Sequence, residues 1–187
     1  MQATPGAPLT PDHTDDTGRI AVPADNAAAR RTVLLLVIAS LAWTADAASK
    51  VVAVDLLSGR EPVQVVPGVL SLTLTRNPGA AFSLGTELTV LLTLVAGVVV
   101  AVVLRISPRV RSTGWAWALG LLLGGALGNL TDRLLRQPGP LRGHVVDFLQ
   151  LPHWPVFNLA DSCIVAAACL IALLSLRGVG LDGDPVA

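Results

Sequence analysis

Charged residues are scarce in this sequence: they make up 14% of its 187 residues, whereas an ordinary soluble domain has about 25%. Apolar residues make up 52%. The 13 Lys and Arg balance the 13 Asp and Glu, so the formal net charge is zero and there is no basic surface for a phosphate backbone. We therefore expect a protein that is not bathed in water on all sides and that has no nucleic-acid partner.

Cysteine is also scarce, and the usual sequence motifs of cofactor chemistry are missing. The two cysteines, Cys163 and Cys169, lie inside one apolar run, which excludes a disulfide framework and a cysteine-rich zinc site. The sequence has no H-E-x-x-H zinc motif, no G-x-S-x-G nucleophile motif and no glycine-rich phosphate loop. We expect neither a metal ion nor a cofactor.

Long apolar stretches are what the sequence does have. A helix needs about 20 residues to cross the roughly 30 Å of hydrocarbon in a bilayer. Four stretches are long enough, at about 32–53, 88–105, 114–134 and 156–176. Residues 1–31 contain few large apolar side chains and are expected to form a disordered tail. Residues 177–187 are expected to form a second tail.

The ends of these stretches predict an orientation. Four spans place both termini on one side, and the pair Arg30 and Arg31 together with the arginines of the 105–111 loop favour the cytoplasm for that side. A cleaved signal peptide is an alternative for the first stretch, because Ala45-Asp46-Ala47 resembles a cleavage site. The apolar character that resumes after Lys50 and the three further spans favour a retained helix.

The segment between the first and second spans, about 54–86, has the pattern of a small sheet. Residues 70–75 alternate Leu with Ser or Thr, the period of a strand with one buried face. This run ends at Asn77-Pro78-Gly79, which suits a type II turn in which Gly supplies the positive φ. We expect a sheet on the outer membrane surface, and hence a mainly helical membrane protein with four spans and a small external β segment.

Polar side chains gather at one level of the predicted bundle. Ionisable groups are expensive in a membrane, so each of them suggests a function. Small residues recur every four positions in the third span, at Gly120, Gly124 and Gly128, and are expected to pack closely against another helix. The predicted orientation puts the following polar residues near the outer face: Asp46, Lys50, Asn129, Asp132, Arg133, Asp147, Asn158 and Asp161.

Several carboxylates in a site bordered by lipid cannot all be ionised, because burial and like charge both favour protonation of one. One ionised and one protonated carboxyl are what an aspartic peptidase needs. The residues alone leave Asp132, Asp147 and Asp161 as candidates, although Arg133 would keep its neighbour Asp132 ionised. Two other interpretations are a small proton-coupled transporter, which would need polar groups at both membrane levels, and a non-catalytic lipid-binding scaffold.

Five motifs, in order, resemble those of bacterial lipoprotein signal peptidase (signal peptidase II), and the resemblance covers residues 32–176. The motifs are D-x-x-x-K at 46–50, N-P-G-A-A-F-S at 77–83, G-G-A-L-G-N-L-T-D-R at 124–133, V-V-D-F at 145–148 and F-N-L-A-D-S at 157–162. One departure is Ala47, where the family usually has Gln.

The resemblance implies a bacterial inner-membrane aspartyl endopeptidase. Such an enzyme removes signal peptides from diacylglyceryl-modified prolipoproteins and cuts before the lipid-bearing Cys. It implies that Asp147 and Asp161 are the catalytic dyad and that the external sheet is a β-cradle over the active site. The other motif residues would shape the site or support the bound peptide: Asp46, Lys50, Asn77, Gly79, Asn129, Asp132, Arg133 and Asn158. Lipidated prolipoproteins and membrane lipids are the expected partners, and a monomer is expected.

Overall fold

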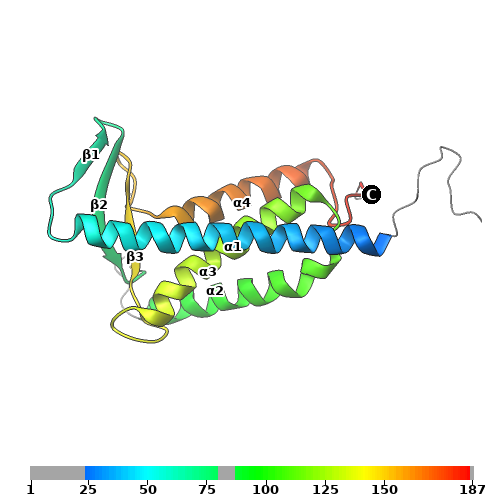
Figure 1. Cartoon of the computed structure of the whole chain (residues 1–187), viewed down its shortest axis with the longest axis horizontal. Coiled ribbons are helices and arrows are strands. Elements are labelled where there is room, and N and C mark those ends of the chain that lie inside the picture. The colour runs from blue at the N-terminus through cyan, green and yellow to red at the C-terminus, as the bar shows by residue number, and fades with distance from the viewer. Residues whose placement is uncertain (1–23, 80–86, 186–187) are drawn as a thin grey trace, which may run out of the picture.

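The computed structural model describes residues 24–79 and 87–185. These residues form four long helices: α1 (Ala24–Leu57), α2 (Glu87–Ile106), α3 (Thr113–Leu135) and α4 (Leu159–Leu176). The helices lie alongside one another, and a short 3-10 helix, η1 (Ser107–Arg109), joins α2 to α3 (Figure 1). Each long helix overlaps one of the four apolar stretches, so all four stretches are helical.

Three of the described helical segments are long and apolar enough to cross a membrane: Ala29–Leu57, Thr89–Arg109 and Leu159–Leu176. This is the composition of a membrane-integral protein. The helix α3 has 23 residues and therefore a sufficient length, but its glycines and the polar residues near its end make it less apolar. Its glycines are explained by its position between α1 and α4.

The first helix is longer than the predicted span 32–53. It begins at Ala24 and ends at Leu57, so residues 24–31, which composition placed in a disordered tail, are helical. Alanine and arginine, which fill most of residues 27–31, are among the best helix formers and extend the helix beyond its apolar part. The remainder of the predicted tail, residues 1–23, lies outside the described residues.

A three-stranded sheet covers one end of the helices (Figure 1). It consists of β1 (Val63–Val66), β2 (Leu70–Asn77) and β3 (Val145–Gln150), antiparallel and in the order β1-β2-β3. Residues 70–75 lie in β2, so the predicted strand is confirmed, but their burial does not alternate, because residues 70–74 are all half-buried. Gly79 has the expected positive φ, +95°. The third strand, β3, belongs to the connection between α3 and α4. The sequence did not predict this strand.

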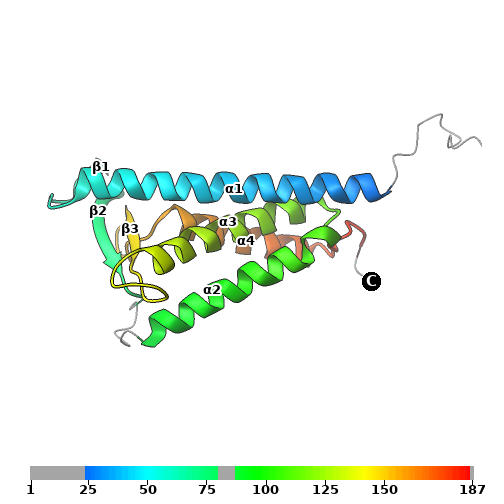
Figure 2. The same ribbon diagram turned by 60° about the horizontal axis from the view of Figure 1, so that its bottom comes forward.

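The glycines of α3 allow close helix packing, as predicted. A Cβ atom on Gly124 would lie 2.6 Å from the Cβ of Ala42 and 2.7 Å from the carbonyl oxygen of Ala39 in α1. On the neighbouring stripe, a Cβ on Gly125 would lie 2.6 Å from the carbonyl oxygen of Ala160 in α4. The helix α3 is therefore the centre of the bundle, whereas α2 diverges from α1 toward the end that carries the sheet (Figure 2).

At the opposite end of the bundle, the segment that follows α4 is bound to the start of α3. The carbonyl oxygen of Leu181 accepts hydrogen bonds from the backbone N–H groups of Arg111 (2.8 Å) and Ser112 (3.0 Å). The indole N–H of Trp115 donates to the carbonyl oxygen of Val179 at 2.8 Å. The predicted C-terminal tail is thus folded back onto the bundle over its described residues.

Candidate active site

Asp147 lies in the middle of β3 and is almost completely buried, with 2% of its surface exposed. Its strand pairs with β2, where Thr75 is its partner. The flanking residues Val146 and Phe148 pack against Ala53 and Leu57 of α1 and so fix the strand against the bundle. Its local sequence alone would suggest a surface segment with a solvated charge, but tertiary packing has buried this carboxyl.

Two side-chain amides hold the Asp147 carboxyl. Asn158 donates from Nδ2 to Oδ1 at 2.7 Å, and Asn77 donates from Nδ2 to Oδ2 at 2.9 Å. Burial raises the pKa of Asp147 to about 6, and the charge of Asp161 also raises it, whereas the hydrogen bonds from Asn77 and Asn158 lower it. This carboxyl therefore changes its protonation state near neutral pH.

Asn77 is positioned by the turn at the end of β2. Its Oδ1 accepts a hydrogen bond from the backbone N–H of Gly79 at 2.8 Å. The carbonyl oxygen of Pro78, between them, accepts a hydrogen bond from the hydroxyl of Thr89, which is buried in α2. The helix α2 therefore holds the turn that aims Asn77 at Asp147, and the sequence motifs did not point to Thr89.

Asn158 and Asp161 form a capping box at the start of α4. The Oδ1 of Asn158 accepts from the backbone N–H of Asp161 at 2.9 Å, and the Oδ2 of Asp161 accepts from the backbone N–H of Asn158 at 3.1 Å. A polar helix start often serves only as a cap. Here Asn158 has a second task, because its Nδ2 donates to Asp147.

Asn129 of α3 completes the connection between the two carboxyls. Its Nδ2 donates to Oδ1 of Asp161 at 2.8 Å. Its Oδ1 accepts from Nδ2 of Asn158 at 3.2 Å and from Nζ of Lys50 at 3.1 Å. Asp147 and Asp161 therefore belong to one network, in which each carboxylate accepts from neutral amides.

Lys50 lies at the base of this network and is buried together with Asp46. Its Nζ is 2.8 Å from Oδ2 of Asp46, one helical turn away, and 2.9 Å from Oδ2 of Asp132 in α3. The other oxygen of Asp46 accepts from the backbone N–H of Ala160 at 2.9 Å. Asp46 and Lys50, four residues apart in α1, therefore form an ion pair that joins α1 to both α3 and α4.

Asp132 has partners other than the one predicted for it. Its carboxylate pairs with Lys50 and with Arg136, and its Oδ2 accepts from the backbone N–H of Val146 at 3.1 Å. Adjacent residues on a helix point about 100° apart, so the side chain of Arg133 points away from the carboxylate of Asp132 and from its two cationic partners. Asp132 therefore holds β3 in place through the residue that precedes Asp147. The i,i+4 spacing of Asp132 and Arg136 was the signal that sequence analysis missed.

Arg133 makes no ion pair with any of the described residues, although it is only 7% exposed. Its Nη1 has no hydrogen-bond partner among them. The ion-pair partners of Asp132 are therefore Lys50 and Arg136, and not Arg133, which we expected to keep Asp132 ionised. The guanidinium lies beside Gly79, where a Cβ atom would be 3.4 Å from Nη2.

Two cavities adjoin the network, and a third lies on the sheet. A groove of about 250 Å³ lies between α2 and α3, with Asn129 and Arg133 in its lining. A second cavity, of about 400 Å³, adjoins Asp161 and includes Phe157 and Trp154.

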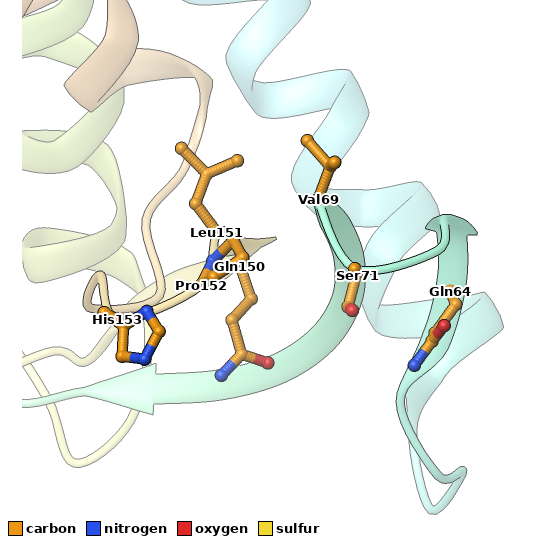
Figure 3. A pocket seen from close by; sticks show the side chains of 8 residues that line it. Gln64, Val69, Ser71, Gln150, Leu151, Pro152 and His153 are labelled. Carbon is orange, nitrogen blue, oxygen red and sulfur yellow. The ribbon is translucent and has the colours of Figure 1, made fainter.

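The third cavity, of about 350 Å³, lies on the sheet and is lined by polar residues including His153. Gln64, Ser71 and Gln150 are partners in the strand register and lie side by side across the sheet there (Figure 3). Within residues 24–79 and 87–185, no group of three or more His, Cys, Asp or Glu is arranged to hold a metal ion.

The structure thus brings all ten predicted site residues to one place. Nine of them are linked by hydrogen bonds or ion pairs: Asp46, Lys50, Asn77, Gly79, Asn129, Asp132, Asp147, Asn158 and Asp161. Gly79 and Arg133 lie against each other at the edge of this network.

Comparison with known proteins points to one family. The family model described as "Signal peptidase (SPase) II" matches residues 38–177. The lipoprotein signal peptidase of Rhodococcus jostii is 48% identical over 92% of this chain and 87% of its own length. That of Mycobacterium tuberculosis is 47% identical over 94% of this chain and 86% of its own, and that of Streptomyces coelicolor is 46% identical over 82% and 76%.

Solved structures show the same fold. A bacterial membrane enzyme solved by the in meso method at 1.9 Å resolution is 26% identical, with a TM-score of 0.68 over 76% of this chain and 92% of its own. A second such structure, at 2.3 Å resolution, is 25% identical, with a TM-score of 0.66 over 76% of this chain and 87% of its own.

Proposed function

We propose that this chain, which belongs to the signal peptidase II family, is a membrane aspartyl endopeptidase with Asp147 and Asp161 as its catalytic pair. It removes signal peptides from diacylglyceryl-modified prolipoproteins and cuts before the lipid-bearing Cys. The observation that carries the assignment of the pair is the Asn158 side chain, which accepts from the backbone N–H of Asp161 and donates to the carboxylate of Asp147. No comparison supports the proton-coupled transporter.

In the proposed reaction, the two carboxyls have different tasks. We assign the proton that is present before the reaction to Asp147, because burial raises the pKa of this carboxyl to about 6. Asp161 then takes a proton from a water molecule whose oxygen attacks the scissile carbonyl carbon, while Asp147 donates its proton to the carbonyl oxygen. The product of this step is a tetrahedral diol, with Asp161 protonated and Asp147 ionised.

The second step restores both residues. Asp161 donates its proton to the leaving nitrogen, the C–N bond breaks, and a diol hydroxyl returns its proton to Asp147. The products are a carboxyl on the signal peptide and an amine on the lipid-bearing Cys. Asn77 and Asn129 keep the outer oxygens of the two carboxyls in place throughout, because each donates to one of them.

The remaining polar residues of the network support the pair without touching the reacting atoms. Asp132 accepts from the backbone N–H of Val146, directly before Asp147, and Asp46 accepts from that of Ala160, directly before Asp161. Lys50 neutralises both of these carboxylates. In this way one buried cation sets the positions of the strand and of the helix that carry the pair.

The membrane arrangement is part of the proposal. All four helices cross the bacterial inner membrane, α3 included, as a monomer with both termini in the cytoplasm. The catalytic pair then lies near the outer face, where water can reach the site while the lipid and the apolar segment of the substrate arrive from the membrane. Support comes from Arg30, Arg31 and the arginines of the α2–α3 connection, which lie at the end of the bundle opposite the sheet.

A cleavage assay tests the catalytic pair. Purified protein is incubated with a diacylglyceryl-modified prolipoprotein, and the loss of the signal peptide is followed on a gel. Asp147→Asn and Asp161→Asn should each lower the rate by more than about a hundredfold. Asp132→Asn should retain part of the activity, and Asp55→Asn, at an exposed position of α1, should behave like the wild type. Full activity of Asp147→Asn would refute the assignment.

A further inference from the structure

The groove between α2 and α3 is apolar over most of its lining. One face of α2 lines it, from Leu92 to Val99, and one face of α3 lines it, from Leu122 to Arg133. At about 1.5 Å per residue, the groove extends about 10 Å along α2 and about 16 Å along α3. Its volume is about 250 Å³, and Ile164 of α4 closes its inner side.

The outer end of the groove is polar, in contrast to the rest. Asn129 and Arg133 are its polar lining residues. Arg133 is more than nine-tenths buried, and its Nη1 has no partner among the described residues. Burying a guanidinium with an unused donor is costly. A ligand that supplies an acceptor at this end and an apolar body below it would remove that cost.

We propose that this groove binds one acyl chain of the lipid-modified substrate, and that Arg133 donates a hydrogen bond to the ester carbonyl of that chain. This inference rests on the proposed function and adds a site for the lipid to it. The ester carbonyl occupies the outer end of the groove, beside Asn129. Because Nδ2 of Asn129 donates to Asp161, the lipid is held next to the catalytic pair.

Peptide is a poor occupant for the same groove. A helical signal segment has a diameter of about 10–12 Å, so even one turn of it is too large for a groove of about 250 Å³. An extended peptide has N–H and C=O groups along its whole length, and the lining below Asn129 and Arg133 has only apolar side chains to offer them. An acyl chain has no such groups, and the groove of about 250 Å³ has room for part of one chain of a diacylglyceryl group, not for both chains.

Filling the groove tests the proposal. Ala96→Phe places a ring in the groove, and Val99→Phe does so one turn deeper, as a second variant in case the first does not fold. Val98→Phe is the matched control, because Val98 is on the same helix, is 62% exposed and does not line the groove. KM and kcat are measured for each variant that keeps the wild-type unfolding temperature, with prolipoproteins carrying either two long or two short acyl chains.

We expect Ala96→Phe and Val99→Phe to raise KM for the long-chain substrate by about tenfold or more, because the ring takes the space of the chain and overpacks the groove when the chain enters. KM for the short-chain substrate and kcat for both should change little, and Val98→Phe should match the wild type. Equal effects on both substrates, or equal effects of Ala96→Phe and Val98→Phe, would overturn the proposal. Phospholipid that co-purifies with each variant is measured as well. If Ala96→Phe and Val99→Phe lost this phospholipid without a change in KM, the groove would be a site for membrane lipid and the proposal would be overturned.

A second comparison tests the role of Arg133. A substrate with ether-linked chains lacks the ester carbonyl, so wild type should bind it about tenfold more weakly than the ester, the usual contribution of a hydrogen bond to a charged group. Arg133→Met should bind the two substrates equally. If the variant still distinguished them, the carbonyl contact would be wrong. These outcomes are separate from failure of the proposed function, which Asp147→Asn tests.

Discussion

The side-chain amide nitrogen of Asn158 lies 2.7 Å from a carboxylate oxygen of Asp147, across the gap between the start of α4 and the middle of β3. The same side chain caps α4 through its oxygen, which accepts from the backbone N–H of Asp161. A single residue therefore both caps the start of α4 and links the two carboxyls.

The two tasks of Asn158 can be separated by substitution. Asn158→Ser keeps a good helix cap but has no amide to reach Asp147, whereas Asn158→Ala loses both functions. We expect both variants to lose at least about tenfold in cleavage rate, and Asn158→Ala to be about 1 kcal/mol less stable than Asn158→Ser. Rates from the gel assay and thermal unfolding in detergent distinguish these effects. Equal stability of the two variants would show that the cap contributes little.

The protonation of Asp147 should give the enzyme a specific pH dependence. The pKa of this carboxyl is raised from its ordinary value of 3.8 to about 6, so the protonated form, which the reaction uses, is lost as pH rises through about 6. The rate kcat/KM should fall in that range. Asn77→Ala removes a hydrogen bond that lowers this pKa, and should therefore move the fall to higher pH.

Stability should respond to the same carboxyl with a defined sign. Because its folded pKa exceeds the unfolded one, Asp147 stabilises the fold below about pH 3.8, and this contribution is lost as pH rises to about 6. Asp147→Asn, which is always neutral, should show a smaller decrease in unfolding temperature between these two pH values than wild type. An identical decrease in both proteins would contradict the buried position of Asp147.

Thr89 should affect catalysis although it is far from the reacting atoms. Its hydroxyl donates to the carbonyl of Pro78 in the turn that positions Asn77. Thr89→Val keeps the shape of the side chain and removes the hydroxyl, so the turn should be held less firmly. The hydrogen bond from Asn77 to Asp147 should then weaken, and the fall in kcat/KM should move to higher pH, as in Asn77→Ala. Thr89→Ser should restore the wild-type profile. A lower rate with an unchanged profile in Thr89→Val would indicate a structural role only.

Gly128 should tolerate no side chain, because a Cβ atom there would meet the carboxylate of Asp46. That carboxylate is held by Lys50 and by the backbone of Ala160, so it cannot move away. Gly128→Ala should therefore destabilise the protein by about 1–3 kcal/mol. Gly97→Ala is the matched control, since nothing lies within 4 Å of its Cβ position in α2. Thermal unfolding of the two variants should differ clearly, and equal stabilities would contradict the close contact.

Local patterns in the sequence were sufficient for the helices and for part of the site. Apolar stretches of sufficient length must be helical in a membrane, because lipid cannot satisfy backbone polar groups. The i,i+4 spacing of Asp46 and Lys50 and the i,i+3 spacing of Asn158 and Asp161 place each pair on one helical face. Both pairs interact as these spacings predict.

Only the tertiary structure decided how those pieces combine. The burial of Asp147 depends on a strand whose partner, Thr75, is distant in the sequence, and Asp132 is paired with Lys50 of another helix. Arg133, next to Asp132 in the chain, is left with an unused donor at the end of a groove between two helices. Periodicity identifies the face of a helix on which a residue lies, but which element meets that face depends on how the whole chain packs.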